Sequence, residues 1–355
     1  MKKALIAMSG GVDSSVAAYL IKKENYETVG VTLKLQNEDY NYVNKQPSCC
    51  SESDIEDARK VCSNLGIEYY VLDFKDDFDK NVISRFVDGY LSGETPNPCI
   101  DCNRYIKFKK MFEFAGEMKA DFVVTGHYAQ IEKTPGGRFL LKKGAFDMKD
   151  QSYVLYNLKQ NELERIIFPI GELKKEDVRQ IAEENGFINS SKPDSQDICF
   201  IKDKDYVSFI ERRLQRKFES GDFVDKNGNF IAKHKGIISY TIGQRKGLGI
   251  ASAEPYYVID KDLQNNRVIL GRMEDQFQKE FVCNDLNLIA FDKLPDNFRC
   301  EVKIRYKHKP AFATLNQIDE DKIKVVFDEP QKAVTKGQAA VFYDSEYVLG
   351  GGKIM

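Results

Sequence analysis

Long hydrophobic runs are absent from this sequence of 355 residues. No apolar stretch approaches the roughly 20 residues that a membrane-spanning helix needs. The opening Met-Lys-Lys leads directly into a predicted strand, without a cleavable signal pattern. We therefore expect a cytoplasmic protein with no membrane partner. A large excess of charge of one sign is also absent, since the formal net charge is −2. The net charge therefore does not predict a polyanionic partner, although local basic faces are present.

Cysteine is sparse, with eight residues spread along the whole chain. This distribution is unlike the dense framework of a small secreted domain. In a cytosolic protein it favours buried, catalytic or metal-binding cysteines over structural disulfides. The hydrophobic fraction of 42% and the charged fraction of 30% are typical of a globular protein, and the length allows two or three domains.

The first residues combine a short apolar strand with a glycine-rich turn. Residues 4–8 form an apolar run that predicts a buried parallel strand, and residues 15–21 show helix formers at helical spacing. The turn between them contains Gly10 and Gly11, flanked by serine hydroxyls. Such a turn lets backbone N–H groups and a helix N-terminus converge on an anion, usually phosphate. It lacks the lysine of a Walker loop and the three spaced glycines of the dinucleotide fingerprint.

The sequence Ser9-Gly10-Gly11-Val12-Asp13-Ser14 resembles the phosphate loop of the ATP pyrophosphatases. Enzymes of this superfamily adenylate a substrate and release pyrophosphate. An ordinary strand-to-helix turn is the alternative, and the strand–turn–helix context of the whole motif favours the phosphate loop.

The first half of the chain alternates strands and helices, which predicts an α/β fold with a doubly wound parallel sheet. Ligands of such sheets bind beyond the carboxyl ends of the strands, where the opening loop, Leu33 and the Gly126-His127 pair are expected. The predicted strands cover residues 28–35, 69–72 and 121–124, and the predicted helices cover residues 53–66, 78–90, 105–118, 161–167, 175–185 and 205–217.

The helical periodicity disappears beyond Gly221, and the remainder is predicted to be β-rich. Hairpin turns are expected at residues 134–137, 225–229 and 264–267. The expected domains are a domain with the phosphate loop at 1–205, a mostly β module with a basic helix at 206–278, and a β-barrel-like module at 279–355.

Cys99, Cys102 and Cys199 differ from the other cysteines in their settings. Cys102 directly precedes the predicted helix at 105–118, and a helix N-terminus with nearby cations favours the thiolate. Cys199 lies in an Asp-rich turn that does not by itself indicate activation. Small buried hydrophobes are the interpretation for Cys62, Cys283 and Cys300, and Cys49 and Cys50 lie in a loop with no assigned role.

Several motifs occur in the order typical of one family. The motifs are the opening loop, Thr95-Pro96-Asn97-Pro98, Cys102-Asn103, Ile106-Lys107-Phe108, Thr125-Gly126-His127-Tyr128, Lys149-Asp150-Gln151-Ser152-Tyr153, Asp194-Ser195, Asp197-Ile198-Cys199-Phe200, Tyr240-Thr241-Ile242-Gly243-Gln244-Arg245 and Arg305-Tyr306. In these motifs the chain resembles the bacterial tRNA-specific 2-thiouridylases.

The resemblance implies a reaction. ATP adenylates O2 of the uridine at the tRNA wobble position, with Asp13 as a Mg²⁺ partner, and pyrophosphate leaves. A sulfur donor, a cysteine desulfurase or a relay protein, loads Cys199 with a persulfide. Cys102 then attacks the uridine or releases the sulfur, and a Cys102–Cys199 disulfide results. The implied ATP contacts are Ala7, Met8, Ser9, Gly10, Gly11, Val12, Asp13, Ser14, Leu33 and Gly126.

The resemblance also implies tRNA contacts. Asn97, Pro98, Cys99 and His127 would surround the extruded base, and Lys149, Asp150, Gln151, Arg305, Tyr306 and Gln338 would contact the rest of the tRNA. From the residues alone, alternation over 299–309 would place Lys303, Arg305, Lys307 and Lys309 on one strand face. A solvated edge strand explains that pattern equally well. A basic helix with Arg212, Arg213, Arg216 and Lys217, and the Arg245-Lys246 pair, add positive charge for phosphates.

Position 99 departs from the family pattern. Many members have aspartate there, whereas this chain has Cys99, which creates a Cys99-x-x-Cys102 motif. Together with Cys199, these thiolates form a possible ligand set for a [4Fe–4S] cluster with one open iron. The cluster-free persulfide scheme is favoured, and zinc lacks four good ligands.

Two other classes of function compete with this interpretation. A small-molecule synthetase of the ATP pyrophosphatase superfamily would keep the opening loop but would not use paired loop cysteines. A non-catalytic RNA-binding protein would show no ATP–pyrophosphate exchange dependent on Asp13. A monomer is expected in either case.

Overall fold

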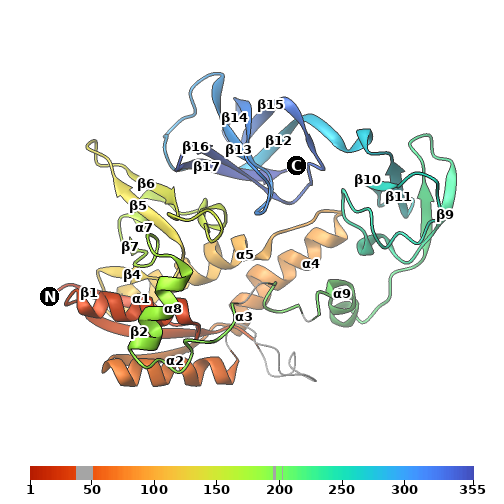
Figure 1. Ribbon diagram of the computed structural model, residues 1–355. Coiled ribbons are helices and arrows are strands. Elements are labelled where there is room, and N and C mark those ends of the chain that lie inside the picture. Colours follow the sequence, from red (N-terminus) through yellow and green to blue (C-terminus); the bar gives the residue numbers. More distant parts are fainter. Residues whose placement is uncertain (37–50, 195–196, 202) are drawn as a thin grey trace. The chain divides into compact units, whose positions relative to one another are not determined.

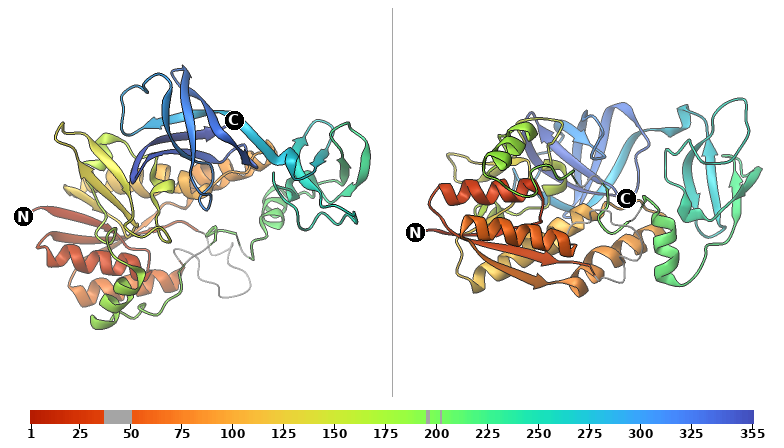
Figure 2. Two further views of the ribbon diagram at one scale, coloured as in Figure 1. Left: turned by 45° about the horizontal axis from the view of Figure 1, so that its top comes forward. Right: turned by 60° about the horizontal axis from the view of Figure 1, so that its bottom comes forward.

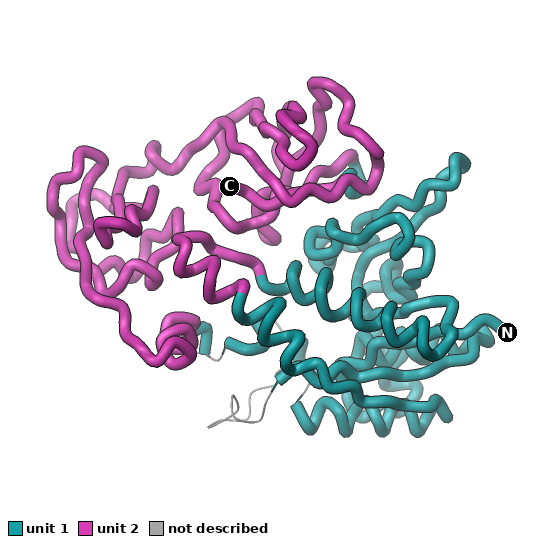
Figure 3. The backbone as a smooth tube through the Cα atoms, turned by 180° about the vertical axis from the view of Figure 1, so that it is seen from behind, with its two compact units in different colours: residues 1–84, 98–204, 345–349 teal, residues 85–97, 205–344, 350–355 magenta. Residues whose placement is uncertain are grey.

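The computed structural model describes residues 1–36, 51–194, 197–201 and 203–355 (Figure 1). The chain divides into two compact units (Figure 3). Unit 1 contains residues 1–84, 98–204 and 345–349, and unit 2 contains residues 85–97, 205–344 and 350–355. Among the described residues, every helix is too short or too polar to cross a bilayer. The predicted roles of Cys49 and Cys50 lie outside the described residues.

Unit 1 is built on a five-stranded sheet with the order β3-β2-β1-β4-β7. Its neighbouring strands all pair in parallel, so the prediction of a doubly wound parallel sheet is confirmed. The central strand places Ile6 between Gly30 of β2 and Val124 of β4. The strands are β1 (Lys3–Ala7), β2 (Glu27–Lys34), β3 (Glu68–Asp73), β4 (Phe122–Val124) and β7 (Ile166–Ile167).

Helices cover both faces of this sheet (Figure 2). Helices α1 (Val12–Lys23), α2 (Glu52–Leu65) and α8 (Lys175–Glu184) contribute to one hydrophobic core, which includes Ile6, Val16, Val61 and Val178. The chain returns from β3 to β4 across the middle of the sheet, and α6 (Lys109–Glu117) of this return packs against β1 and β4. Because crossovers are right-handed, this helix covers the opposite face.

Helix starts differ most from prediction. Helix α2 begins after Ser51, whose hydroxyl and Asp54 form a reciprocal capping box, so the predicted start at Ser53 is wrong. Its predicted end at Gly66 is confirmed, with φ of 60°. The predicted helix 78–90 is a longer run made of α3 (Lys75–Phe78), the π-helix η2 (Asp79–Ile83) and α4 (Ser84–Leu91).

A second helical run begins at Pro98 rather than near Tyr105. It consists of α5 (Pro98–Asp101), the π-helix η3 (Cys102–Phe108) and α6. The prolines suggested a loop, but asparagine is favoured directly before a helix and proline at its first position. The Asn97-Pro98 pair therefore starts a helix.

The rest of unit 1 follows the sheet. The hairpin of β5 (Ala129–Lys133) and β6 (Phe139–Lys143) confirms the turn at 134–137, and Tyr347 and Val348 of β17 pair with β6. The predicted helix 161–167 is too long, because Ile166 and Ile167 pair with Val123 and Val124. The remaining elements are η4 (Ser152–Leu155) and α7 (Gln160–Leu163).

Unit 2 contains a small four-stranded sheet with the order β10-β11-β8-β9. Both predicted hairpin turns are confirmed, at 225–229 and 264–267. The strands are β8 (Gly221–Val224), β9 (Phe230–His234), β10 (Tyr257–Asp262) and β11 (Arg267–Gly271), with η5 (Ile237–Ser239) between β9 and β10. Helix α9 (Tyr206–Leu214) ends where Gln215 adopts φ of 51°, so Arg216 and Lys217 lie outside it, contrary to prediction.

The last strands form a closed ring. Their order is β12-β15-β14-β13-β16-β17, and β12 also pairs with the end of β17. The expectation of a β-rich tail with a barrel-like end is therefore confirmed. The strands are β12 (Phe277–Leu288), β13 (Phe298–Lys303), β14 (Ala311–Asp319), β15 (Lys322–Lys332), β16 (Ala339–Asp344) and β17 (Tyr347–Ile354), and η6 (Glu274–Gln276) precedes them.

The predicted basic strand at 299–309 is wrong. Strand β13 ends at Lys303, so Arg305, Lys307 and Lys309 do not share a strand face with it. Pro310 has no backbone N–H for a ladder. The Arg305 guanidinium instead donates hydrogen bonds to the carbonyl of Ala333 and the hydroxyl of Thr335. These contacts within unit 2 account for an arginine at this position, and a basic strand face is not needed to explain it.

Candidate active site

The glycine-rich turn lies at the carboxyl end of β1, as predicted. Gly10 has φ of +74°, a conformation that side chains disfavour. A Cβ at this position would lie 2.3 Å from the backbone oxygen of Asp54. On the other side, a Cβ at Gly126 would lie 2.8 Å from the backbone nitrogen of Ser14. Glycine at both positions allows this close backbone packing around the turn.

The N-terminus of α1 is suited to an anion. Gly11 is the N-cap and provides no side-chain acceptor for the first-turn N–H groups. The Ser14 hydroxyl accepts a hydrogen bond from the Ser9 N–H and donates one to the Gly11 carbonyl. Unpaired N–H groups and the helix dipole together favour phosphate, so the turn fits the triphosphate of ATP.

The neighbouring strand ends support the turn. In β2, the Thr32 hydroxyl donates to the carbonyl of Met8 over 2.6 Å, and Leu33 is buried beside it. After β4, Thr125 Oγ1 and His127 Nδ1 lie 2.7 Å apart, and the His127 ring stacks on Phe108. Burial, with a smaller contribution from the charge of Lys107, holds the pKa of His127 well below its usual value. His127 is therefore a neutral imidazole at the carboxyl edge of the sheet.

Asp13 belongs to a charged network that sequence reasoning did not find. Its Oδ1 accepts hydrogen bonds from Tyr128 Oη at 2.8 Å and from Lys175 Nζ at 2.7 Å. Lys175 also contacts Asp194 at 2.7 Å, and Lys149 contacts Asp194 at 2.6 Å. Burial would raise the pKa of Asp194, but the bonds from Lys149 and Lys175 outweigh it and lower the pKa.

The pKa of Tyr128 is raised by burial and by the adjacent Asp13 carboxylate, so the phenol keeps its proton and donates it. The only local signal for these partners was the position of Tyr128 next to Gly126-His127. Lys175 and Asp13 are far apart in the sequence, and no short motif joins them.

The half-buried Asp13 carboxylate beside the turn suits Mg²⁺ in this type of site. Mg²⁺ is usually held by one or two carboxylates together with substrate phosphates. Asp13 has a side chain that is 31% exposed, beside the anion-binding turn. Among the described residues, there is no group of three or more His, Cys, Asp or Glu side chains placed to hold a metal ion without such phosphates.

The cysteines differ in exposure. Cys99 is exposed, Cys102 is buried and Cys199 is half-buried. The predicted position of Cys102 at a helix N-terminus is wrong, because the helical run already begins at Pro98. Among the described residues, Cys99, Cys102 and Cys199 do not form a group placed to hold a metal ion. Burial raises the pKa of Cys62, Cys283 and Cys300 to about 12, which confirms them as buried residues.

Cys199 is held at the end of β2. The side-chain amide of Gln36, just beyond this strand, donates a hydrogen bond to the Cys199 carbonyl over 3.1 Å. The neighbouring Phe200 ring packs edge-on against Phe78. These contacts bring the Cys199 segment to the same edge of the sheet as the anion-binding turn.

Several residues expected to contact tRNA have internal partners. The buried Asp150 carboxylate accepts hydrogen bonds from the N–H groups of Gly144 and Ser152. Gln151 accepts the N–H of Tyr128, and Gln338 donates to the Thr95 carbonyl. Pro98 is buried, whereas Tyr306 is 37% exposed.

Comparisons with known proteins cover the whole chain. Three family models match it, described as the tRNA methyl transferase HUP domain at residues 2–203, the tRNA methyl transferase PRC-barrel domain at 207–272, and the aminomethyltransferase beta-barrel domain at 278–354. Among solved structures, a 4-thiouridine synthetase–RNA complex with bound ATP aligns with a TM-score of 0.39 and 20% identity, over 60% of this chain and 50% of that chain.

Curated relatives are much more similar. The tRNA-specific 2-thiouridylase MnmA of Clostridioides difficile (strain 630) is 51% identical over 99% of this chain and 98% of that protein. MnmA 2 of Clostridium botulinum (strain Okra / Type B1) is 49% identical over 99% of both chains. With this identity over nearly the full length, the chain belongs to the family of tRNA-specific 2-thiouridylases.

Proposed function

We propose that this chain is a tRNA-uridine 2-sulfurtransferase that uses ATP to replace O2 of the wobble uridine by sulfur. The observation that carries the proposal is the shared edge of one parallel sheet. An anion-binding turn, the Asp13 carboxylate and the segment of Cys199 all belong to this edge. The names of the full-length relatives support tRNA as the substrate.

In the first step, the turn from Ser9 to Ser14 binds the ATP phosphates. O2 of the uridine attacks the α-phosphorus, an O2–P bond forms, and the bond to the β-phosphate oxygen breaks to release pyrophosphate. Mg²⁺, when bound at Asp13, neutralises charge on the phosphates. Positioning and charge neutralisation carry most of such a transfer. Lys175 and Tyr128 contribute by orienting the Asp13 carboxylate.

In the second step, sulfur replaces the activated oxygen. The terminal sulfur of a Cys199 persulfide, supplied by a sulfur donor, attacks C2 of the uridine and AMP leaves. The Cys102 thiolate attacks Cys199 Sγ, the S–S bond breaks, and the transferred sulfur stays on C2. The products are 2-thiouridine and a Cys102–Cys199 disulfide, which a thiol reductant must open.

The remaining assignments belong to the same proposal. We propose that the three segments 1–205, 206–278 and 279–355 act as catalytic, central and tRNA-binding modules in a cytoplasmic monomer. The extruded base would meet Asn97, Pro98, Cys99 and His127, and Lys149, Asp150, Gln151, Arg305, Tyr306 and Gln338 would contact the tRNA. The internal hydrogen bonds of Asp150 suggest that it acts by shaping its loop.

The test is mass spectrometry of wobble nucleosides after incubation with ATP, Mg²⁺, a cysteine desulfurase with cysteine, and unmodified tRNA. Wild-type protein should form 2-thiouridine, and Cys102→Ala and Cys199→Ala should form none. Cys62→Ser is the matched control, because Cys62 is a buried cysteine in α2, well separated in sequence from Cys102 and Cys199. Unchanged uridine with the wild-type chain would refute the proposal.

Cys99→Asp separates the persulfide scheme from an iron–sulfur cluster. The substitution removes one of three thiolates that a cluster would need but leaves Cys102 and Cys199. Because Cys99 is exposed, folding should be unaffected. We expect the Cys99→Asp variant to keep its activity. We also expect the wild-type chain to hold no stoichiometric iron after anaerobic reconstitution. Loss of activity together with bound iron would contradict the persulfide scheme.

A further inference from the structure

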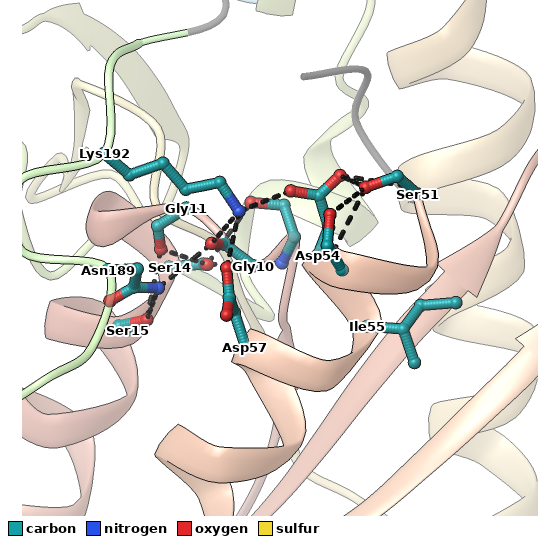
Figure 4. A network of polar contacts seen from close by, with 12 residues as sticks. Gly10, Gly11, Ser14, Ser15, Ser51, Asp54, Ile55, Asp57, Asn189 and Lys192 are labelled. Carbon is teal, nitrogen blue, oxygen red and sulfur yellow. Dashed lines mark hydrogen bonds and ion pairs between the residues drawn. The ribbon is translucent and has the colours of Figure 1, made fainter. Parts of the chain in front are cut away.

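The carbonyl oxygen of Gly10 is held by two side chains from a distant segment (Figure 4). Asn189 Nδ2 donates a hydrogen bond to it over 3.0 Å, and Lys192 Nζ donates a second one over 3.2 Å. Asn189 is only 2% exposed. Both residues follow α8, far from the turn in the sequence, and neither has a role in the reaction described above.

The next carbonyl, that of Gly11, points into the same network. It accepts hydrogen bonds from the hydroxyls of Ser14 at 2.9 Å and Ser15 at 3.1 Å. The Ser15 hydroxyl in turn accepts a bond from Asn189 Nδ2 at 2.9 Å. Asn189 therefore contacts one carbonyl directly and the other through a single hydroxyl (Figure 4).

Because the peptide unit is planar, these contacts also set the direction of the two N–H groups that follow the carbonyls. In a trans peptide the C=O and the following N–H point to opposite sides. Fixing the carbonyls of Gly10 and Gly11 therefore directs the N–H groups of Gly11 and Val12 away from Asn189 and toward the anion side of the turn. We propose that Asn189 and Lys192 are positioning residues that hold these two N–H groups on the triphosphate of ATP. The inference rests on the proposed function in so far as the anion is ATP.

Lys192 has a second effect, which is electrostatic. Its ammonium contacts Asp54 at 2.6 Å and Asp57 at 2.7 Å, and the Asp54 side chain is 6% exposed. Burial would lower the pKa of Lys192, but hydrogen bonds to both carboxylates outweigh it and raise the pKa, so the ammonium stays charged. Without Lys192, two carboxylates beside the turn would repel a bound triphosphate.

The test measures ATP affinity in the full chain, separately from catalysis and stability. Asn189→Asp keeps the shape and removes the donor but adds a negative charge, so Asn189→Leu, which removes the donor without adding a charge, is measured beside it. Lys192→Met removes the ammonium charge. We expect the dissociation constant for a non-hydrolysable ATP analogue with Mg²⁺, by calorimetry, to rise roughly 10- to 100-fold, the effect of losing about one hydrogen bond between the misdirected N–H groups and the charged triphosphate. KM for ATP should rise by a similar factor, with little change in kcat or in KM for tRNA.

Two controls distinguish positioning from general destabilisation. Lys192→Arg keeps the charge and the donors and should restore most of the ATP affinity. Lys60→Met removes a lysine of α2 that pairs with Glu56 on an exposed face, and this variant should bind ATP like wild type. If Lys192→Met fails to fold, Asn189→Ala and Lys192→Arg still report on the contact through KM and kcat.

The outcomes separate this inference from the proposed function. Wild-type ATP affinity in folded Asn189→Asp and Lys192→Met would overturn the inference. A fall in kcat and in the affinities for ATP and tRNA in equal proportion would also overturn it, because that pattern indicates a structural role. If the wild-type chain binds no ATP analogue, the proposed function fails instead.

Discussion

Replacing Lys175 by methionine removes the ammonium that Asp13 and Asp194 share. Both contacts are 2.7 Å long, and the Lys175 side chain is only 9% exposed. Removing one partner of a buried ion pair leaves an uncompensated charge and costs on the order of 3–5 kcal/mol, and here two carboxylates lose the same partner. Lys149 and Arg179 still face Asp194. They reduce the expected loss in the free energy of unfolding to about 2 kcal/mol.

The assay is urea unfolding of the wild-type and Lys175→Met chains, each with and without Mg²⁺ and an ATP analogue. Mg²⁺ can take over the neutralisation of Asp13, so ligand should raise the unfolding midpoint more in the variant than in wild type. Lys174→Met is the control, since this neighbouring lysine is exposed and covers the Phe146 ring. An unchanged midpoint in Lys175→Met, or equal stabilisation of both chains by the ligand, would refute the reasoning.

Three further predictions concern the turn, pH and the C-terminal unit. Gly10→Ala should lower the thermal midpoint and weaken ATP binding, because its Cβ meets the Asp54 backbone at 2.3 Å, whereas a Cβ at Gly11 would meet only a hydroxyl at 3.5 Å and Gly11→Ala should unfold like wild type. The folded chain keeps His127 unprotonated, whereas in the unfolded chain this histidine binds a proton below its ordinary pKa of 6.5. The free energy of unfolding should therefore fall as pH drops below 6.5, by at most about 1.4 kcal/mol per pH unit. In unfolding curves measured at several pH values, His127→Asn should show a weaker pH dependence than wild type. Arg305→Ala should destabilise unit 2 by about 1–3 kcal/mol, because it removes the guanidinium that donates to Ala333 and Thr335, although the Ala333 carbonyl keeps its bond from the Thr335 hydroxyl. Limited proteolysis should then cleave unit 2 faster than in wild type, and an unchanged cleavage rate would contradict this.

The parts of the site that sequence could predict depend on local pattern. The anion-binding turn is one continuous segment, and its glycines, hydroxyls and flanking strand and helix all lie within a few residues. The parallel sheet followed from alternating short apolar runs and helical segments, and its carboxyl edge followed from topology. For that reason the sequence alone predicts Leu33 and Gly126 at this edge.

The parts that sequence could not predict depend on partners far along the chain. Lys175 reaches Asp13 across 162 positions, and Lys192 reaches Gly10 across 182. No short motif contains both members of either pair. The error at Arg305 has the same origin, since alternation predicts a strand face, whereas tertiary contacts with Ala333 and Thr335 turn the side chain inward.

The π-helical segment η3 makes the pitch of the chain around Cys102 as consequential as its chemistry. A residue in an α-helix turns the chain by about 100°, and a residue in the wider π-helix turns it by less. Conversion of residues 102–108 to α-helical pitch at unchanged length would therefore rotate the preceding turn relative to α6. The thiol of Cys102 would then face a different side of the helix although every catalytic side chain was retained. Substitutions in this segment that favour a regular α-helix are therefore expected to lower activity even where the chain stays folded.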